Sequence, residues 1–191
     1  GIFAKPDGSK YYVVSGTSSD TVLVMNSTLT SVLRRIDLGA EARGAGLSPD
    51  GRRLLVFAGN RLHVFDTTKT NDDEITREAG LDAGTSPTEL AFALDSSVAL
   101  ILSPDSGEVA LYNLATNSVG SSNDLGAAAT SVNVAPNGRF YVTATNVIYE
   151  VDSANAEVMR EIRVNGSPRK GSFTPDGKYG LFPNAPAFVA T

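Results

Sequence analysis

The hydrophobic and polar positions of the chain alternate between short apolar runs and polar turns. Runs of about five mostly apolar residues are separated by stretches rich in Gly, Pro, Ser, Thr and Asn. Apolar residues at the three- and four-residue spacing of an amphipathic helix do not recur along the chain. The pattern therefore predicts an all-β protein built from many short strands.

A turn-like tetrapeptide marks an internal repeat. Its Pro presets φ, its Asp or Asn can bond its own backbone, and its Gly accepts a positive φ. Four copies and one degenerate copy follow one another at steps of about 40 residues: Lys5-Pro6-Asp7-Gly8, Ser48-Pro49-Asp50-Gly51, Ala93-Leu94-Asp95-Ser96, Ala135-Pro136-Asn137-Gly138 and Thr174-Pro175-Asp176-Gly177. Five turns in one register predict a repeat architecture.

The strands around each turn differ in character. The strand before the turn is rich in small residues, as in Gly44-Ala45-Gly46, and small side chains fit where neighbouring strands lie close together. The two strands after the turn, such as 53–57 and 62–65, are apolar on both faces and must be covered on both sides. The last strand, as in 158–164, is charged, which protects a sheet edge from pairing with other chains. Each repeat thus predicts an inner, two middle and an outer strand.

Four strands in about 40 to 45 residues are typical of a β-propeller blade, whereas a β-sandwich does not predict a repeat in register. We expect one all-β region, 1–191, of four-stranded antiparallel blades, about four and a half of them. The expected blades are 1–40, 41–83, 84–126, 127–166 and a partial 167–191 without its outer strand, with boundaries near Gly39, Ala83, Gly126 and Gly166.

The ends of the chain favour part of a larger ring. Gly1 is not an initiator Met, and the sequence stops abruptly at Phe188-Val189-Ala190-Thr191. An incomplete ring leaves apolar blade faces exposed, so self-association of two copies is one alternative, and closure into a small ring is another.

The repeat resembles the YVTN-type β-propeller family of surface-layer and lactonase-like proteins. The resemblance rests on the Ser-Pro-Asp-Gly turn, the following aromatic-Val strand and the later Gly-Ser-Pro. Tyr12-Val13-Val14 and Tyr141-Val142-Thr143 stand where the name-giving motif would. It covers essentially the whole chain and implies a propeller exported to the extracellular space or cell envelope. Lactonase-type, NHL-type and quinoprotein-like propellers share these short motifs.

Composition excludes several classes of protein. With 16 Lys and Arg against 21 Asp and Glu, the net charge is −5, and no basic cluster favours nucleic acid. No apolar run approaches the ~18 residues of a membrane helix. Without Cys there is no disulfide framework, zinc ribbon or thiol nucleophile.

No motif predicts a catalytic residue, a metal site or a cofactor. The single His, His63, lies within a strand with Arg61 and Phe65 on one face, so we expect a structural or solvent-edge side chain. No Gly-x-Ser-x-Gly elbow presents a nucleophile. The acidic run Asp72-Asp73-Glu74 lacks the spacing of a calcium loop and reads as a solvated loop.

Other polar residues read as turn formers. Asp105 and Glu108 are expected in a hairpin turn. A polar residue ends each second middle strand, and we expect its side chain to cap the next turn: Asn26, Asp66, Asn113 and Asp152.

The candidate ligand site is the set of loops that enter the inner strands. In the family that the chain resembles, this loop often reads Ser-Pro-His-Gly, and the His positions are here Arg43, Thr88, Thr130 and Arg169. Equivalent loops of a ring converge on one axis, so these residues and Glu89 are expected at one channel mouth. The two Arg side chains would favour a carboxylate or phosphate; ion pairs with Glu41 or Glu89 are the alternative.

We therefore expect a non-catalytic binding or structural module that presents loops on a rigid ring to a protein, a glycan or a small ligand. The alternative is a fragment of a propeller enzyme, a lactonase-like hydrolase or a quinoprotein-like dehydrogenase, whose catalytic residues lie partly outside this chain. Docking of the propeller into a larger assembly is a third possibility.

Overall fold

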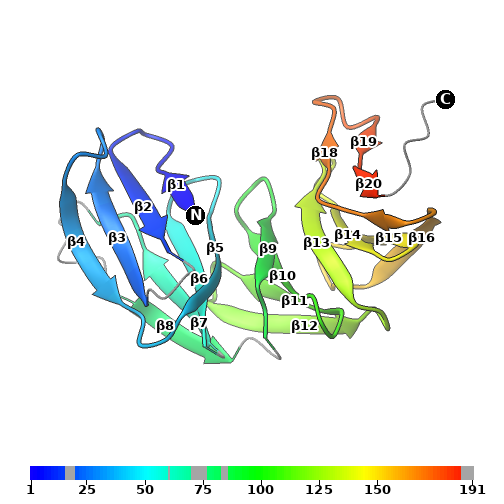
Figure 1. Cartoon of the computed structure of the whole chain (residues 1–191), viewed down its shortest axis with the longest axis horizontal. Coiled ribbons are helices and arrows are strands. Elements are labelled where there is room, and N and C mark those ends of the chain that lie inside the picture. Colours follow the sequence, from blue (N-terminus) through cyan, green and yellow to red (C-terminus); the bar gives the residue numbers. More distant parts are fainter. Residues whose placement is uncertain (16–19, 60, 70–76, 83–85, 186–191) are drawn as a thin grey trace. The chain divides into compact units, whose positions relative to one another are not determined.

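All regular secondary structure in the described part of the chain is β. The computed structural model describes residues 1–15, 20–59, 61–69, 77–82 and 86–185, which contain twenty strands and no helix (Figure 1). The described residues therefore contain no helix that could cross a membrane. The expected loop Asp72-Asp73-Glu74, the boundary at Ala83 and the last residues, 188–191, lie outside this part.

Sixteen of the strands form four antiparallel sheets, each with its strands paired in sequence order. We call these sheets blades 1 to 4. Blade 1 contains β1 (Ile2–Ala4), β2 (Lys10–Val14), β3 (Thr21–Asn26) and β4 (Val32–Asp37); blade 2 contains β5 (Ala42–Leu47), β6 (Arg53–Ala58), β7 (Arg61–Asp66) and β8 (Arg77–Asp82). Blade 3 contains β9 (Glu89–Phe92), β10 (Val98–Ser103), β11 (Glu108–Asn113) and β12 (Ser118–Asp124); blade 4 contains β13 (Ala129–Val134), β14 (Phe140–Ala144), β15 (Val147–Val151) and β16 (Val158–Arg163).

The fifth repeat forms only a hairpin. Its inner strand is split into β17 (Ser167–Pro168) and β18 (Ser172–Phe173), and its second strand into β19 (Gly180–Leu181) and β20 (Asn184–Ala185). β17 pairs with β20 and β18 with β19, and no third strand joins them among the described residues. We call this element the fifth hairpin. The sequence predicts a last blade that lacks only its outer strand; the described residues of this repeat contain its inner strand and one middle strand.

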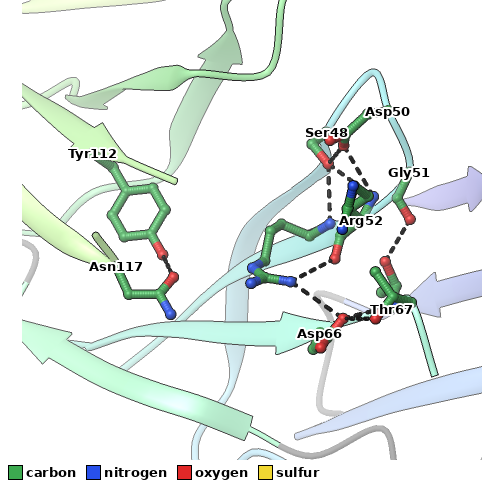
Figure 2. Close-up of polar contacts among 10 residues, drawn as sticks. Ser48, Asp50, Gly51, Arg52, Asp66, Thr67, Tyr112 and Asn117 are labelled. Atoms are coloured by element: carbon green, nitrogen blue, oxygen red, sulfur yellow. Dashed lines mark hydrogen bonds and ion pairs between the residues drawn. The ribbon is translucent and has the colours of Figure 1, made fainter. Parts of the chain in front are cut away.

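The repeated turn is held by its own Asp or Asn, as expected. In blade 2 the Asp50 carboxylate accepts the Arg52 N–H (3.0 Å) and the Ser48 hydroxyl (2.6 Å), and the Thr67 hydroxyl donates to the Gly51 carbonyl (2.5 Å) (Figure 2). The same bond to the N–H two residues on is made in the other four turns, by Asp7, Asp95, Asn137 and Asp176.

The side chains at the ends of the third strands cap turns, which confirms a second prediction. Each oxygen accepts a backbone N–H two to five residues further on; the four residues are Asn26, Asp66, Asn113 and Asp152. Asp105 lies in the turn between β10 and β11, where the Gly107 N–H donates to the Ser103 carbonyl (2.9 Å). Local hydrogen bonds of this kind satisfy backbone groups that the strands leave open.

Gly1–Ala83 and Gly84–Thr191 are two compact units, each with a core between successive blades. In the first unit β1 lies beside β5, and Tyr12 and Val24 of blade 1 are buried with Leu54 and Val56 of blade 2. In the second unit β9 lies beside β13, and blades 3 and 4 enclose a core that includes Leu100, Leu102, Val109, Phe140 and Val142. Burial against a neighbouring blade explains why the middle strands are apolar on both faces.

Exposure follows the predicted gradient from inner to outer strand. The middle strands of blades 2 to 4 are almost wholly buried and those of blade 1 are partly buried, whereas the outer strands β4, β12 and β16 are mostly exposed. β12 is rich in Ser rather than in charges, so polarity is what the described outer strands share. His63 is buried, with 2% exposure, on a middle strand between Val56 and Gly80, which excludes the solvent-edge alternative.

Candidate functional site

The inner strands that follow blade 1 start with a β-bulge, and the candidate residues lie in it; β1 of blade 1 pairs in regular register. Between β5 and β6 the register shifts by one residue between Ala42 and Gly44, so Arg43 is the extra residue of the strand. Between β13 and β14 the same shift falls between Ala129 and Ser131, and Thr130 is the extra residue.

Blade 3 and the fifth hairpin have the same irregularity. The Leu102 carbonyl accepts the Thr88 N–H (3.2 Å), although the residue opposite Leu102 is Glu89, so two residues again face one. In the fifth hairpin Pro168 lies opposite Asn184 and Ser172 opposite Leu181, so four steps along one strand face three along the other. Arg169 lies in this interval.

The bulge separates a buried residue from a more exposed one. The residue before each candidate is small or a proline and is buried: Ala42, Pro87, Ala129 and Pro168. The candidate that follows is exposed at Arg43, Thr130 and Arg169 and half-buried at Thr88. A bulge bends the strand and changes the direction of its side chains. One side chain in each of these four strands therefore faces solvent, where a regular strand would bury it.

The second unit brings several of these strand starts together. The Thr130 hydroxyl contacts the Thr143 hydroxyl (2.7 Å) and donates to the carbonyl of Pro168 in the fifth hairpin (2.9 Å). Glu89 of blade 3 reaches the same hairpin through an ion pair with Lys170 (3.6 Å). Thr88, Glu89, Thr130 and Arg169 therefore belong to one neighbourhood of the second unit.

Arg43 lies in the first unit, and its convergence with the other four residues stays a prediction. Within its own blade it is an exposed side chain beside the glycine-rich segment Gly44–Gly46. The predicted alternative of a Glu89 ion pair is realised with Lys170 rather than with an arginine. The Lys170 side chain is 64% exposed and the Glu89 side chain 36%, so water weakens this ion pair and it contributes little to stability.

Sequence reasoning missed a buried cluster of polar side chains that contacts Thr130. Thr143 and Ser131 are buried and share a hydroxyl contact of 2.8 Å, and Asn133 donates weakly to Ser131 (3.5 Å). A signal was present, because Thr143 is the third residue of Tyr141-Val142-Thr143 in an otherwise apolar middle strand. Lys170 was not predicted as a site residue, because its neighbour Arg169 stands at the position where the family that the chain resembles often has His.

A buried carboxylate on the same face of blade 4 was also missed. Glu150 is 2% exposed, and its two oxygens bind the guanidinium groups of Arg139 and Arg160, the latter through a contact of 2.7 Å. Burial by itself would raise the pKa of Glu150, but the hydrogen bonds and positive charges of both arginines outweigh it, so the pKa lies below its ordinary value.

The arrangement can bind a polar or anionic molecule. Hydroxyl, guanidinium and ammonium groups donate hydrogen bonds to carboxylate, phosphate or sugar oxygens. In the part of the chain that the structure describes, no three His, Asp or Glu side chains gather closely enough to hold a metal ion.

No protein-family model and no curated protein matches the sequence. Solved structures match its fold. Hydrazine synthase of Kuenenia stuttgartiensis has a TM-score of 0.76 and 18% identity, over 94% of this chain and 53% of its own. The periplasmic gluconolactonase of Pseudomonas aeruginosa has a TM-score of 0.74 and 18% identity, over 96% and 62%. Dihydro-heme d1 dehydrogenase has a TM-score of 0.77 and 19% identity, over 96% and 41%.

These neighbours are β-propeller proteins, and the chain spans 41% to 62% of their length. At such low identity the likeness establishes a fold and not an activity. Together with the four-stranded antiparallel sheets it shows that the chain has the fold of a partial β-propeller.

Proposed function

We propose that the chain is part of an exported β-propeller of the YVTN type, whose role is to bind a polar or anionic ligand without catalysing a reaction. The ligand lies in the second unit, at the starts of its inner strands, where Thr88, Thr130 and Arg169 each follow a buried residue; Arg43 holds the equivalent position in the first unit. A protein or glycan surface that offers carboxylate, phosphate or hydroxyl groups has the matching chemistry.

The observation that carries the proposal is the recurrence of the bulge. The same irregularity occurs at four strand starts, and each time a polar side chain follows a buried small residue or proline. Bulges are enriched at sheet edges and beside functional sites, where they re-aim side chains. A purely structural inner strand has no need of the same break at four successive strand starts.

Two further features support the family and the location. Tyr12-Val13-Val14 and Tyr141-Val142-Thr143 occupy the second strand of their blades, β2 and β14, so the family's name-giving motif falls at equivalent places. One structural neighbour is described as periplasmic, which fits export of this chain.

The test is a titration of the protein with inorganic phosphate and acetate, followed by NMR chemical shifts. We expect millimolar binding that shifts the amide signals of Thr130 and Arg169 and that is weakened about fivefold in Arg169→Ala. Arg43→Ala measures whether the first unit contributes to the binding. Arg163→Ala is the matched control, because this arginine is largely exposed on the outer strand β16. Binding that is the same in all four proteins would contradict the proposal.

A second candidate is the enzyme fragment, favoured by neighbours described as a gluconolactonase and a dehydrogenase. It predicts hydrolysis of a sugar lactone above the rate in buffer when a divalent metal is added. An unchanged rate with and without metal, alongside anion binding at Arg169, favours the binding module.

A further inference from the structure

Two asparagines of the chain are followed by glycine. Asn137 lies in the repeated turn of blade 4, and Asn165 lies just after β16. In an Asn–Gly pair the main-chain nitrogen of the glycine can attack the asparagine side chain, because glycine has no Cβ to hinder the approach. The structure holds the two glycine nitrogens in different ways, so the two sites differ in how easily this attack occurs.

The turn around Asn137 is held by hydrogen bonds between near neighbours. Asn137 is exposed, and the Gly138 N–H donates to the Ala135 carbonyl (2.9 Å) within the same turn. A Cβ added to Gly138 would meet nothing within 4 Å, so there is space beside this peptide. The Arg139 N–H donates to Oδ1 of Asn137 (3.1 Å), where it can stabilise the negative charge that develops on this oxygen during the attack. Opening this single turn frees the Gly138 nitrogen.

The peptide between Asn165 and Gly166 is held by residues far away in the sequence. The Gly166 N–H donates to the side-chain oxygen of Asn146 (2.9 Å). The carbonyl of the same peptide accepts the side-chain amide of Asn184. Two backbone bonds join this segment to the β14–β15 turn, from the Asn146 N–H to the Gly166 carbonyl (2.7 Å) and from the Val164 N–H to the Asn146 carbonyl (3.0 Å). The Gly166 nitrogen is freed only when the segment leaves blade 4, which costs more free energy than opening one turn.

We propose that Asn137 is a site of spontaneous covalent modification, which yields aspartate and isoaspartate, and that the fold protects Asn165. The Gly138 nitrogen loses its proton and bonds to the side-chain carbonyl carbon of Asn137, and ammonia leaves to give a cyclic succinimide. Water then opens the ring at one of its two carbonyls. One opening gives aspartate; the other gives isoaspartate, in which the main chain runs through the former side-chain carbon. Either product adds one negative charge to the net charge of −5.

The two products should affect blade 4 differently. Aspartate occupies the same position in the other four turns, where its oxygen accepts the N–H two residues further on, as the Asn137 oxygen does here. The aspartate product therefore keeps the turn. Isoaspartate adds a CH2 group to the main chain between β13 and β14, so the turn must change its shape.

The test is incubation of the intact chain at mildly alkaline pH, followed by peptide mapping with mass spectrometry, which detects the exchange of NH2 for OH at each asparagine. Methyl transfer by an isoaspartyl methyltransferase measures the isoaspartate. We expect Asn137 to react at least about tenfold faster than Asn165 in the folded chain, because the free energy of opening enters the rate directly. In guanidinium chloride the two rates should become similar. Equal rates in the folded chain, an equally large difference in denaturant, or no conversion of Asn137 would overturn the proposal.

A substitution at Asn146 tests the protection of Asn165. Asn146→Gly removes the acceptor of the Gly166 N–H and tolerates the φ of +64° at this position. It should speed the reaction of Asn165 about fivefold, the effect of one hydrogen bond, and leave the rate at Asn137 unchanged. An unchanged rate at Asn165 would contradict the assigned protection.

Asn137→Asp reproduces the aspartate product. It should release no ammonia from this turn and unfold at the same urea concentration as the parent chain, because the other turns already contain aspartate. A clear loss of stability in this variant would contradict the statement that aspartate keeps the turn.

Discussion

At the scale of single residues, Glu150 is the most constrained charge in the described second unit. It lies on a buried middle strand, and only the guanidinium groups of Arg139 and Arg160 compensate for its loss of water. Both arginines are themselves partly exposed, so either can return to solvent when the carboxylate is lost. The carboxylate has no such freedom, and its protonation must therefore affect stability.

Acid should destabilise the protein through this residue. Because the pKa of Glu150 is lower in the folded chain than its ordinary 4.5, its ionised form contributes stability above that pH, and the contribution is lost as the pH falls through the folded value. Glu150→Gln should cost about 2 kcal/mol at pH 7 and flatten the acid limb of stability against pH. Urea unfolding at several pH values measures both. The exposed Glu161→Gln should behave like the parent chain; equal acid limbs in all three proteins would refute this role.

The hydroxyl of Ser48 supports the turn of blade 2 in a different way. It is 1% exposed, donates to Asp50 and accepts the N–H groups of Arg52 and Arg53 (3.2 and 3.0 Å). Ser48→Ala should lower the free energy of unfolding by about 1 to 3 kcal/mol, because the partly buried Arg53 N–H loses its acceptor and Asp50 loses a donor. Ser9→Ala, at an exposed turn hydroxyl of blade 1, should cost less than about 0.5 kcal/mol. Urea denaturation compares them, and equal losses would contradict the argument.

At the scale of elements, the repeated turns also serve as contacts between successive blades. Gly51 has φ of +69°, and a Cβ added there would collide with the Pro6 ring in the turn of blade 1. Gly8 has the same φ of +69° in its own turn but has nothing within 4 Å of an added Cβ. Comparing substitutions at the two glycines therefore separates the free-energy cost of a positive φ from the cost of the collision with Pro6.

Gly8→Ala should destabilise the protein by about 1 to 2 kcal/mol, the cost of a left-handed non-glycine residue. Gly51→Ala should cost more, because the turn must also move away from Pro6. Thermal and urea unfolding of the two variants give the difference. Equal losses would mean that the turns of blades 1 and 2 are not in firm contact.

The blade faces predict a second contrast. Leu100 is fully buried between blades 3 and 4, whereas Met159 on the outer strand β16 is 49% exposed. Leu100→Ala should cost about 2 to 5 kcal/mol through lost burial and a residual cavity, and Met159→Ala less than about 1 kcal/mol. The measurement is urea unfolding followed by circular dichroism. Similar small losses would show that this face is not tightly packed.

At the scale of the whole molecule, the sequence predicts what local chemistry determines. The Pro-Asp-Gly turns and the capping side chains after the third strands depend on neighbours in sequence, and they were predicted correctly. The predicted charge of the outer strands holds for β4 and β16 but not for the Ser-rich β12. The bulges at Arg43 and Thr130 and the partners of Glu150 were not predicted, because register and long-range pairing depend on where separate strands meet. The loop positions were found only through the family resemblance, and their convergence on one axis stays a prediction.

The acidic balance of the chain is also a property of the whole molecule. With a net charge of −5 and a pI of about 4.9, repulsion between copies should vanish near pH 5. Static light scattering should show a solubility minimum there and clear solutions at pH 7. A minimum displaced by more than about one pH unit would show that bound ions or a partner alter the surface charge.

The bulges at the starts of the inner strands after blade 1 have a consequence for protein engineering. They offer one addressable position per repeat, next to a buried anchor, where a new side chain meets solvent rather than the packed interior. Replacing Thr88 and Arg169 together should therefore change the recognition chemistry of the second unit at little cost in folding stability, provided that Thr130, whose hydroxyl bonds Thr143 and Pro168, is kept. A library restricted to these codons would sample many binding specificities on an unchanged scaffold.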